Sequence, residues 1–214
     1  MIRVAVRRKA FGATDVLRDI AFTLDPGETL AVLGPSGIGK STLLRLIAGI
    51  DHDFDGEITR PERMAMVFQE PTLLLWRTAL QNLTLVHPDL GDTAALAALG
   101  QVGIADKADL FPRQMSLGQQ RRLALARAFA GRPQLLMLDE PFVSLDHDMA
   151  EEMLALTEAL IAGARPATIL VTHSEAEAGR LASRVLRLAG RPATILADSG
   201  ARSKTPPPPR LGAA

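Results

Sequence analysis

Short apolar runs alternate with segments of helical periodicity along most of the chain. Residues 29–33, 64–68, 135–138 and 168–172 are apolar runs of strand length. Buried parallel strands carry continuous apolar runs of this kind. After the first run, apolar residues recur at helical spacing from residue 41 to residue 49. Strands that alternate with helices favour an α/β fold with a mainly parallel core sheet.

The regions before and between these runs have a different character. Residues 1–28 are typical of strands joined by turns, with a strong turn signal at Asp25-Pro26-Gly27-Glu28. Between residues 71 and 130 alanine and leucine dominate and β-branched residues become rare, most clearly from Leu73 to Pro112. We therefore expect a helical subdomain at about 71–130, inserted in the α/β core.

The second half of the chain returns to the α/β pattern and then changes to a proline-rich end. Helices are predicted at 150–162 and 175–182. Pro206 to Pro209 stand in a row, which predicts a solvated, disordered tail over residues 199–214. One domain is expected to span residues 1–198.

Composition narrows the classes of function. The formal net charge is zero, which argues against a broad nucleic-acid surface. The 214 residues include no cysteine, so disulfides and thiolate chemistry are excluded. No apolar run reaches the roughly 20 residues of a membrane-spanning helix. We therefore expect any role at a membrane to come through a partner.

A glycine-rich segment links the first apolar run to the helix after it. Residues 34–41 match the phosphate-loop pattern G-x-x-x-x-G-K-[ST]. Glycines let backbone N–H groups converge on phosphate oxygens, and the following helix adds its N-terminal dipole. Lys40 is expected to reach the β and γ phosphates, and the Ser41 hydroxyl to bind Mg²⁺. The alternative is a chance glycine-rich turn.

Two acids follow the apolar run at 135–138. Ligands bind at the carboxyl ends of parallel strands, so Asp139 is expected to hold Mg²⁺ and Glu140 to polarise the attacking water. Adjacent strand residues point to opposite sides, which lets one acid face the metal and the other the water. The alternative is a strand that simply ends in solvent-exposed acids.

With these motifs the sequence resembles the ATP-binding cassette (ABC) transporter family over residues 2–197. Phe11 stands where the family places an aromatic residue that stacks on adenine. Gln69 is similar to the Q-loop glutamine, and residues 115–121, Met-Ser-Leu-Gly-Gln-Gln-Arg, resemble the signature motif. Ser144-Leu145-Asp146 resembles the D-loop, and His173 the switch histidine. In isolation Gln69 would be an ordinary polar loop residue, His173 a structural histidine and Phe11 a core residue.

The resemblance implies a P-loop NTPase fold with a mainly parallel core sheet, an N-terminal antiparallel β subdomain and an inserted helical subdomain. It also implies a MgATP site completed by a second chain. Residues expected to bind ATP are Phe11, Gly34, Pro35, Ser36, Gly37, Ile38, Gly39, Lys40, Ser41 and Thr42, joined from the other chain by Ser116, Gly118, Gln119 and Asp146. The expected Mg²⁺ ligands are Ser41, Gln69 and Asp139. The expected catalytic residues are Lys40, Gln69, Glu140 and His173.

Two features depart from the family pattern. The third signature position, usually glycine, is Leu117, while Gly118 keeps the position of close approach. The backbone N–H of Leu117 remains, so we expect hydrolysis to survive. After Ala197 the sequence has no room for an extra regulatory domain, so feedback by substrate through such a domain is not expected.

The resemblance extends to partners. Residues 71–85 lie where the family docks its permease, and the stretch from Trp76 to Leu85 resembles nitrate, sulfonate and taurine importers. The apolar segment 73–77 can equally pack inside the helical subdomain. We expect a homodimer or paired cassette at the cytoplasmic face of a bacterial inner membrane, with permease subunits and a solute-binding protein. The alternatives are a soluble ABC-type ATPase with a non-transport role and a phosphate-loop kinase outside this family.

Overall fold

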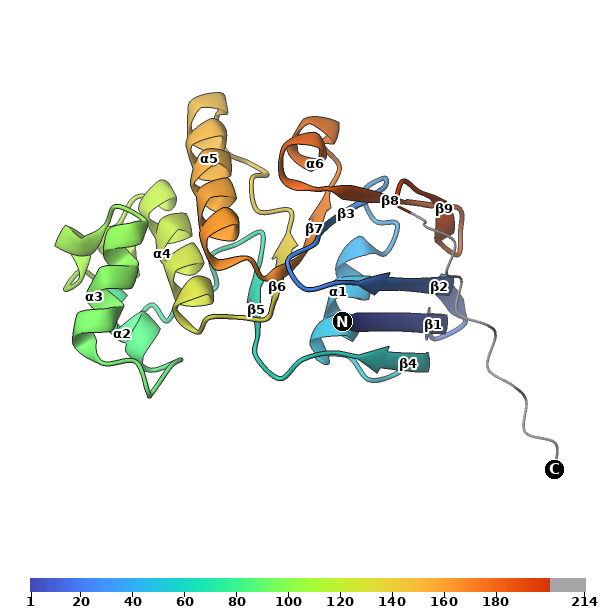
Figure 1. Cartoon of the computed structure of the whole chain (residues 1–214), viewed down its shortest axis with the longest axis horizontal. Coiled ribbons are helices and arrows are strands. Elements are labelled where there is room, and N and C mark those ends of the chain that lie inside the picture. The colour runs from blue at the N-terminus through green and yellow to red at the C-terminus, as the bar shows by residue number, and fades with distance from the viewer. Residues whose placement is uncertain (201–214) are drawn as a thin grey trace.

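The computed structural model describes residues 1–200, which form two β-sheets with helices on either side (Figure 1). The smaller sheet is antiparallel, with strand order β2-β1-β4. The larger sheet has the order β5-β6-β7-β3-β8-β9, in which every pairing is parallel except β8 with β9. The strands are β1 (Ile2–Phe11), β2 (Thr14–Leu24), β3 (Thr29–Leu33), β4 (Asp55–Thr59), β5 (Met64–Val67), β6 (Leu135–Asp139), β7 (Ala167–Thr172), β8 (Arg184–Ala189) and β9 (Thr194–Asp198).

Helices cover both faces of the larger sheet. The helix α1 lies between the two sheets, whereas α5 and α6 cover the opposite face (Figure 1). The α-helices are α1 (Lys40–Ala48), α2 (Ala79–Thr84), α3 (Asp92–Gln101), α4 (Leu117–Ala130), α5 (His147–Ala164) and α6 (Glu175–Leu181). Short 3₁₀ turns at Ala105–Lys107 and Pro112–Gln114 connect α3 to α4.

Strand β6 shows why the core divides in two. All five of its residues are buried. Leu135 and Met137 pack with α1 and the antiparallel sheet, while Leu136 and Leu138 pack with α4 and α5. Because side chains of a strand alternate between faces, one continuous apolar run serves both cores. The mainly parallel core sheet, the antiparallel N-terminal sheet and the helices between residues 71 and 130 agree with the predicted fold class.

Other details differ from the prediction. Strands β8 and β9 were not predicted. Residues 73–78 are not helical, because the buried amide of Asn82 organises them as a loop: it accepts from Leu74 N at 2.8 Å and donates to the Leu74 and Arg77 oxygens at 3.1 and 3.2 Å. Thr78 then caps α2 in a capping box with Gln81.

The C-terminal prediction is corrected in part. Ser199 and Gly200, predicted to begin the disordered tail, form a turn in which Ser199 pairs with Val185 through both its backbone N–H and its hydroxyl. The rest of the predicted tail lies outside the described residues. Within residues 1–200, no helix combines the length and hydropathy that crossing a bilayer requires.

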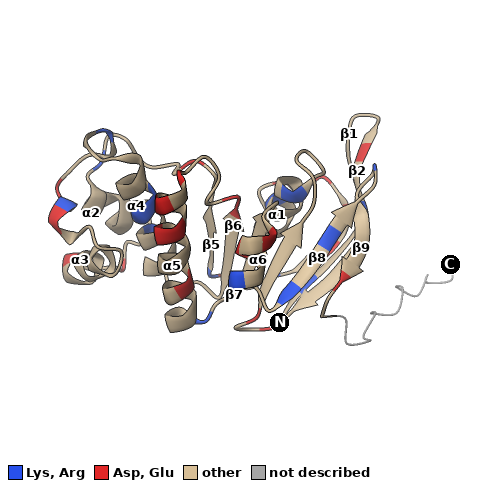
Figure 2. Ribbon diagram, turned by 90° about the horizontal axis from the view of Figure 1, so that it is seen from above, with Lys and Arg blue, Asp and Glu red and all other residues tan. Residues whose placement is uncertain are grey.

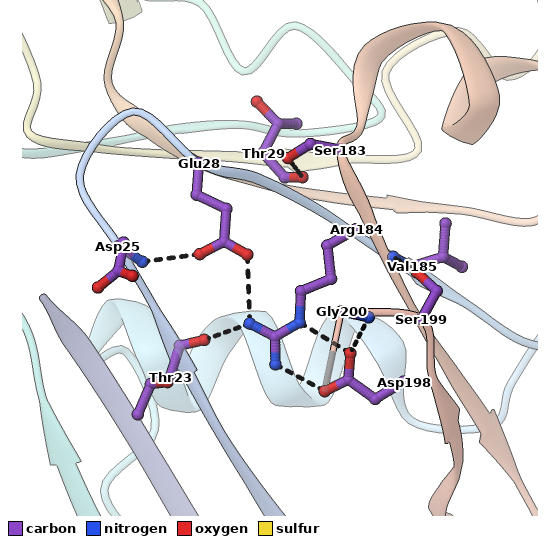
Figure 3. Close-up of polar contacts among 10 residues, drawn as sticks. All are labelled: Thr23, Asp25, Glu28, Thr29, Ser183, Arg184, Val185, Asp198, Ser199 and Gly200. Carbon is purple, nitrogen blue, oxygen red and sulfur yellow. Dashed lines mark hydrogen bonds and ion pairs between the residues drawn. The ribbon is translucent and has the colours of Figure 1, made fainter. Parts of the chain in front are cut away.

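Arg184 joins three elements at the end of the larger sheet (Figure 3). Its guanidinium donates two hydrogen bonds to Asp198 of β9, at 2.7 and 2.6 Å. The Nη1 atom also donates to the Thr23 oxygen at 2.8 Å and to Glu28 at 3.2 Å. The hydrogen bonds with Arg184 lower the pKa of Asp198, and those with Asp198 and Glu28 raise the pKa of Arg184. The β2–β3 turn is thereby tied to β8 and β9.

Replacing Arg184 by glutamine should destabilise the fold, because it leaves two largely buried carboxylates without their cation. We expect a loss of about 2 kcal/mol and a fall in Tm of roughly 6 °C. Since the pKa of Asp198 is lowered in the folded state, this stabilisation is fully present above the unfolded pKa of about 3.9 and is lost as the pH falls from there through the lower folded pKa. Thermal unfolding at pH 7 and at pH 3, with R191Q as an exposed control, measures both effects. Equal Tm values for R184Q and R191Q at pH 7 would contradict this assignment.

Candidate functional site

The carboxyl ends of the parallel strands meet at one edge of the larger sheet. Leu33 and Thr172, the last residues of β3 and β7, pair with each other. Asp139, the last residue of β6, pairs with Val171. The loops that leave these strands therefore start from the same edge, where α/β proteins bind their ligands.

The phosphate-loop segment follows β3 and leads into α1. Gly37 and Gly39 have φ angles of 74° and 111°, a region that favours glycine. A Cβ on Gly39 would lie 2.8 Å from Leu17 and 2.9 Å from Val16 of β2, so only glycine fits there. The loop is thus pressed against the antiparallel sheet, a contact that the sequence did not reveal.

Lys40 folds back over this loop at the start of α1. Its ammonium donates to the Gly34 and Pro35 oxygens at 2.9 and 3.1 Å and lies 3.3 Å from Glu140. The side chain is almost fully buried. Glu140 Oε2 in turn lies 3.5 Å from Nδ1 of His173, which follows β7. The structure therefore brings together three of the predicted catalytic side chains.

Ser41 and Asp139 form a second contact across the same edge. The Ser41 hydroxyl donates to Asp139 Oδ1 at 2.8 Å. Burial raises the pKa of Asp139 and the charge of Glu140 adds to this, against the hydrogen bond from Ser41. A nearby cation would favour the charged carboxylate and so reverse this shift.

The geometry of Glu140 corrects the expectation based on strand alternation. The strand ends at Asp139, and Glu140 has a φ of 46° in the left-handed region. Its backbone N–H still donates to the Val171 oxygen at 2.9 Å. Because the chain turns here, both acids face the phosphate-loop segment instead of opposite sides of the sheet.

Gln69 lies at the same edge but apart from these contacts. It follows β5, which pairs with β6, and its side chain is exposed. In the described part of the chain it makes no hydrogen bond to Ser41, Asp139 or Glu140. Its predicted role as a Mg²⁺ ligand therefore stays a prediction.

Phe11 stands at the tip of the hairpin between β1 and β2. The residue is 55% exposed, so it is not a core residue. Lys9 Nζ lies 4.6 Å from the ring centroid. Lys9 itself is buried and donates to Asp51 at 3.0 Å, which fixes the hairpin against the segment after α1. An exposed aromatic face at a fixed place can stack on a base.

The signature segment lies at the start of α4. Ser116 and Gln119 form a capping box, with hydrogen bonds of 3.3 and 2.9 Å. Gly118 is buried, and a Cβ there would lie 3.2 Å from Met149 of α5, so its close approach is to its own chain. Leu117 is 46% exposed and points away from the core.

Asp146 has a similar structural role one helix later. It caps α5 by accepting from Met149 N at 2.9 Å, and it is exposed. The helix α4 lies well apart from α1, with strands of the larger sheet between them (Figure 1). The nucleotide contacts predicted at the start of α4 therefore do not join those of the phosphate-loop segment within one chain.

Arg121 has a structural role near the site that sequence analysis did not predict. It extends from α4 and donates to the Pro141 oxygen and, at 2.9 Å, to the Val143 oxygen. Its burial lowers the pKa of the guanidinium. These bonds tie the signature helix to the loop between Glu140 and Asp146. Only the folded chain reveals this role, because the acceptors are backbone oxygens.

Taken together, the carboxyl edge offers a glycine loop at a helix N-terminus, one lysine, one histidine, a hydroxyl and two carboxylates. A loop of this kind binds phosphate groups through its N–H groups and the helix dipole. Such a set of groups can bind a nucleoside triphosphate and direct a water molecule at its terminal phosphate.

Comparisons with known proteins agree with this geometry. The family described as ABC transporter matches residues 17–143. The aliphatic sulfonates import ATP-binding protein SsuB of Mycobacterium sp. (strain MCS) is 45% identical over 194 residues, which cover 88% of this chain and 79% of that protein. SsuB 1 of Pseudomonas aeruginosa (strain UCBPP-PA14) is 42% identical over 203 residues, with coverages of 88% and 82%.

A solved structure shares the fold over almost its whole length. It is the dimeric, post-hydrolysis state of the ATP-binding cassette MJ0796 bound to ADP and Pi. The TM-score is 0.79 at 26% sequence identity, and the match covers 92% of this chain and 97% of that one. The P-loop NTPase fold class is thereby confirmed, and the chain belongs to the ABC transporter family as one of its ATP-binding ATPase cassettes.

Proposed function

We propose that this chain is the ATP-hydrolysing subunit of an importer for aliphatic sulfonates, and that it works as a dimer on a separate permease. The observation that carries the catalytic part is the convergence of Lys40, Glu140 and His173 at one sheet edge. The two SsuB relatives are ATP-binding proteins for the import of aliphatic sulfonates, which supports import and the sulfonate class of solute.

The phosphates of ATP would lie on the N–H groups of residues 34–42. Lys40 would exchange its bonds to the Gly34 and Pro35 oxygens for bonds to the β and γ phosphates. Phe11, on its fixed hairpin, would stack on the adenine. The ATP contacts proposed from this chain are therefore the ones predicted from the sequence, Phe11 and residues 34–42.

The oxygen ligands fit a magnesium ion. Hard divalent cations prefer hydroxyl and carboxylate oxygens, and Ser41 and Asp139 present one of each. Within residues 1–200 no three His, Cys, Asp or Glu side chains are grouped so that they alone could hold a metal ion. A magnesium ion would therefore depend on phosphate oxygens and water, with Gln69 as a further ligand. When bound, it neutralises charge that develops on the phosphates.

Glu140 would orient the attacking water. Its carboxylate lies between Lys40 and His173, so a water beside it faces the phosphates held by Lys40. His173 would donate a hydrogen bond to the γ-phosphate and hold the carboxylate in place. Donors fixed in advance around developing charge lower the barrier without reorganising during the reaction.

The second chain would complete each site. Ser116 and Asp146 are exposed cap residues, and the helix α4, which Ser116 caps, lies apart from α1 (Figure 1). In a dimer, Ser116, Gly118, Gln119 and Asp146 of one chain would face the ATP held by the other. The dimeric state of MJ0796 supports this arrangement.

The loop before α2 would receive the permease. Leu75, Trp76 and Arg77 are exposed, with Trp76 69% exposed. The amide of Asn82 hydrogen-bonds the backbone of this loop, so Leu75 and Trp76 would be presented to a partner, while Leu73 packs against the core. A preorganised aromatic anchor is typical of interfaces. We place the chain accordingly at the cytoplasmic face of a bacterial membrane, with a solute-binding protein on the other side.

Replacing Glu140 by glutamine should abolish turnover but leave ATP binding intact. The amide keeps the size of the side chain but removes the charge that polarises the water. We expect the hydrolysis rate to fall by at least about 100-fold. Phosphate release and the binding of a fluorescent ATP analogue measure the two effects. The exposed Glu57→Gln variant is the matched control, and normal turnover in E140Q would refute this role for Glu140.

Replacing Leu117 by glycine should change hydrolysis little, because the exposed side chain leaves the backbone N–H free. We expect a rate within about twofold of the original and a stability loss below about 1 kcal/mol from the weaker helix start. Ser116→Ala is the contrasting variant, since it removes the cap and costs about 1 kcal/mol. If the original chain does not hydrolyse ATP and the L117G variant does, this expectation is wrong.

Replacing Trp76 by glutamate should release the chain from its permease. A buried interfacial tryptophan contributes about 2 kcal/mol or more, so the affinity should fall roughly 30-fold. Co-purification of the tagged chain from membranes measures the loss. Leu196→Glu, which changes an equally exposed residue on β9, is the control. Equal recovery of membrane subunits by both variants would place the docking surface elsewhere.

A further inference from the structure

A large cavity opens at the edge of the sheet opposite the ATP site. Its volume is about 1120 Å³. It is lined by Gln134, the residue before β6, and by Ala167, which begins β7, together with residues of α3 and the last turns of α4 and α5. Pockets that hold small ligands measure roughly 300–1,000 Å³, so this cavity has room for an organic molecule.

The charged lining of the cavity is entirely positive. Arg60, Arg63, Arg132 and Arg165 line it, and no aspartate or glutamate does. Glu62 is exposed and lies outside the lining. Arg60 is half-buried and donates to the Leu46 oxygen at 3.5 Å. The other three guanidinium groups are exposed and, within residues 1–200, make no side-chain hydrogen bond or ion pair.

Helix C-termini do not account for this charge. The helices α3, α4 and α5 end at the cavity, and α1 ends at the oxygen that Arg60 contacts. Each C-terminus carries about −0.5 charge, so four contribute about −2 against four guanidinium groups. The acidic residues of α5 (Asp148, Glu151, Glu152 and Glu158) lie along the exposed length of the helix, outside the lining (Figure 2).

Two of the arginines occupy positions where glycine is the usual residue. Arg132 and Arg165 have φ angles of 45° and 51° just after α4 and α5. Left-handed residues at helix ends are most often glycine, because a Cβ is unfavourable there. A long cationic side chain at both positions brings charge to the rim of the cavity that glycine would not supply.

The wall between the arginines is apolar. Phe129, Leu156 and Leu160 line it, together with alanines of α3. We propose that this cavity binds an amphipathic organic anion, with its acidic head on the exposed arginines and its aliphatic part on this wall. Guanidinium groups bind sulfonate, carboxylate and phosphate oxygens alike, so the head group sets the charge and the wall selects an aliphatic chain.

The place of the cavity gives such a ligand a regulatory role. The ligand would touch α3 on one side and, on the other, Gln134 just before β6 and Ala167 at the start of β7; both strands end at the ATP site. An aliphatic sulfonate is an amphipathic anion, so the imported solute itself belongs to the class. The choice of an aliphatic sulfonate as the test ligand rests on the proposed function. The proposal that the cavity binds an amphipathic anion does not.

Binding of 1-octanesulfonate to the purified full-length chain, below its micelle concentration and without ATP, tests the proposal. Titration calorimetry should detect saturable binding. The triple variant R63Q/R132Q/R165Q should weaken it roughly 30-fold, about threefold for each exposed guanidinium. The charge-matched control R3Q/R113Q/R191Q, at exposed arginines outside the lining, should bind like the original chain.

Further binding measurements distinguish the contribution of the anionic head group from that of the aliphatic chain, and a free anion from a lipid. Sulfate and 1-octanol should each bind more weakly than the sulfonate. Phosphatidylglycerol vesicles that bind the original chain but not the triple variant, without sulfonate binding, would assign the site to a lipid head group. Equal octanesulfonate affinity in both triple variants would overturn the site. If the triple variant does not fold, R63Q alone should still show the threefold loss. Since ATP is absent, a failed import function leaves this result unaffected.

Discussion

The parallel pairing of β6, β7 and β3 is the constraint on which the rest of the structure depends. It places the ends of these strands at one edge, so the phosphate loop, Asp139 and His173 begin from the same line. A slip of one residue would turn every side chain of a strand to the other face. Strand β6 prevents such a slip because its alternate side chains fill two different cores.

Sequence analysis could predict the parts of this arrangement that depend on local pattern. Continuous apolar runs gave the buried strands, and the spacing of Gly34, Gly39 and Lys40 gave the phosphate loop. It could not predict what depends on distant groups. The left-handed turn at Glu140 and the buried amide of Asn82 each change the direction of the chain through contacts that no local periodicity encodes. The same holds for Arg184, whose partners come from separate strands.

Two residues that serve folding are also the ones proposed to contact nucleotide across the dimer. Ser116 and Asp146 satisfy the first N–H groups of α4 and α5, so both are already explained by capping. Their side chains are nevertheless exposed and face outward. A cap residue is held rigidly by its own helix, which makes it a good contact for a second chain at little further cost in conformational entropy.

The hydrogen bonds of Arg121 bear on the order in which the two sites of the proposed dimer would hydrolyse ATP. Its helix begins with Ser116, which in the proposed dimer touches the nucleotide of the partner, while the guanidinium holds the backbone beside Glu140 of its own chain. Little more than one helical turn therefore separates Ser116, the proposed contact to one nucleotide, from the guanidinium that holds the backbone beside Glu140 at the other site. A movement of α4 when phosphate leaves one site would displace the carboxylate of Glu140 in the other site. The two ATP molecules would then be hydrolysed one after the other, not independently.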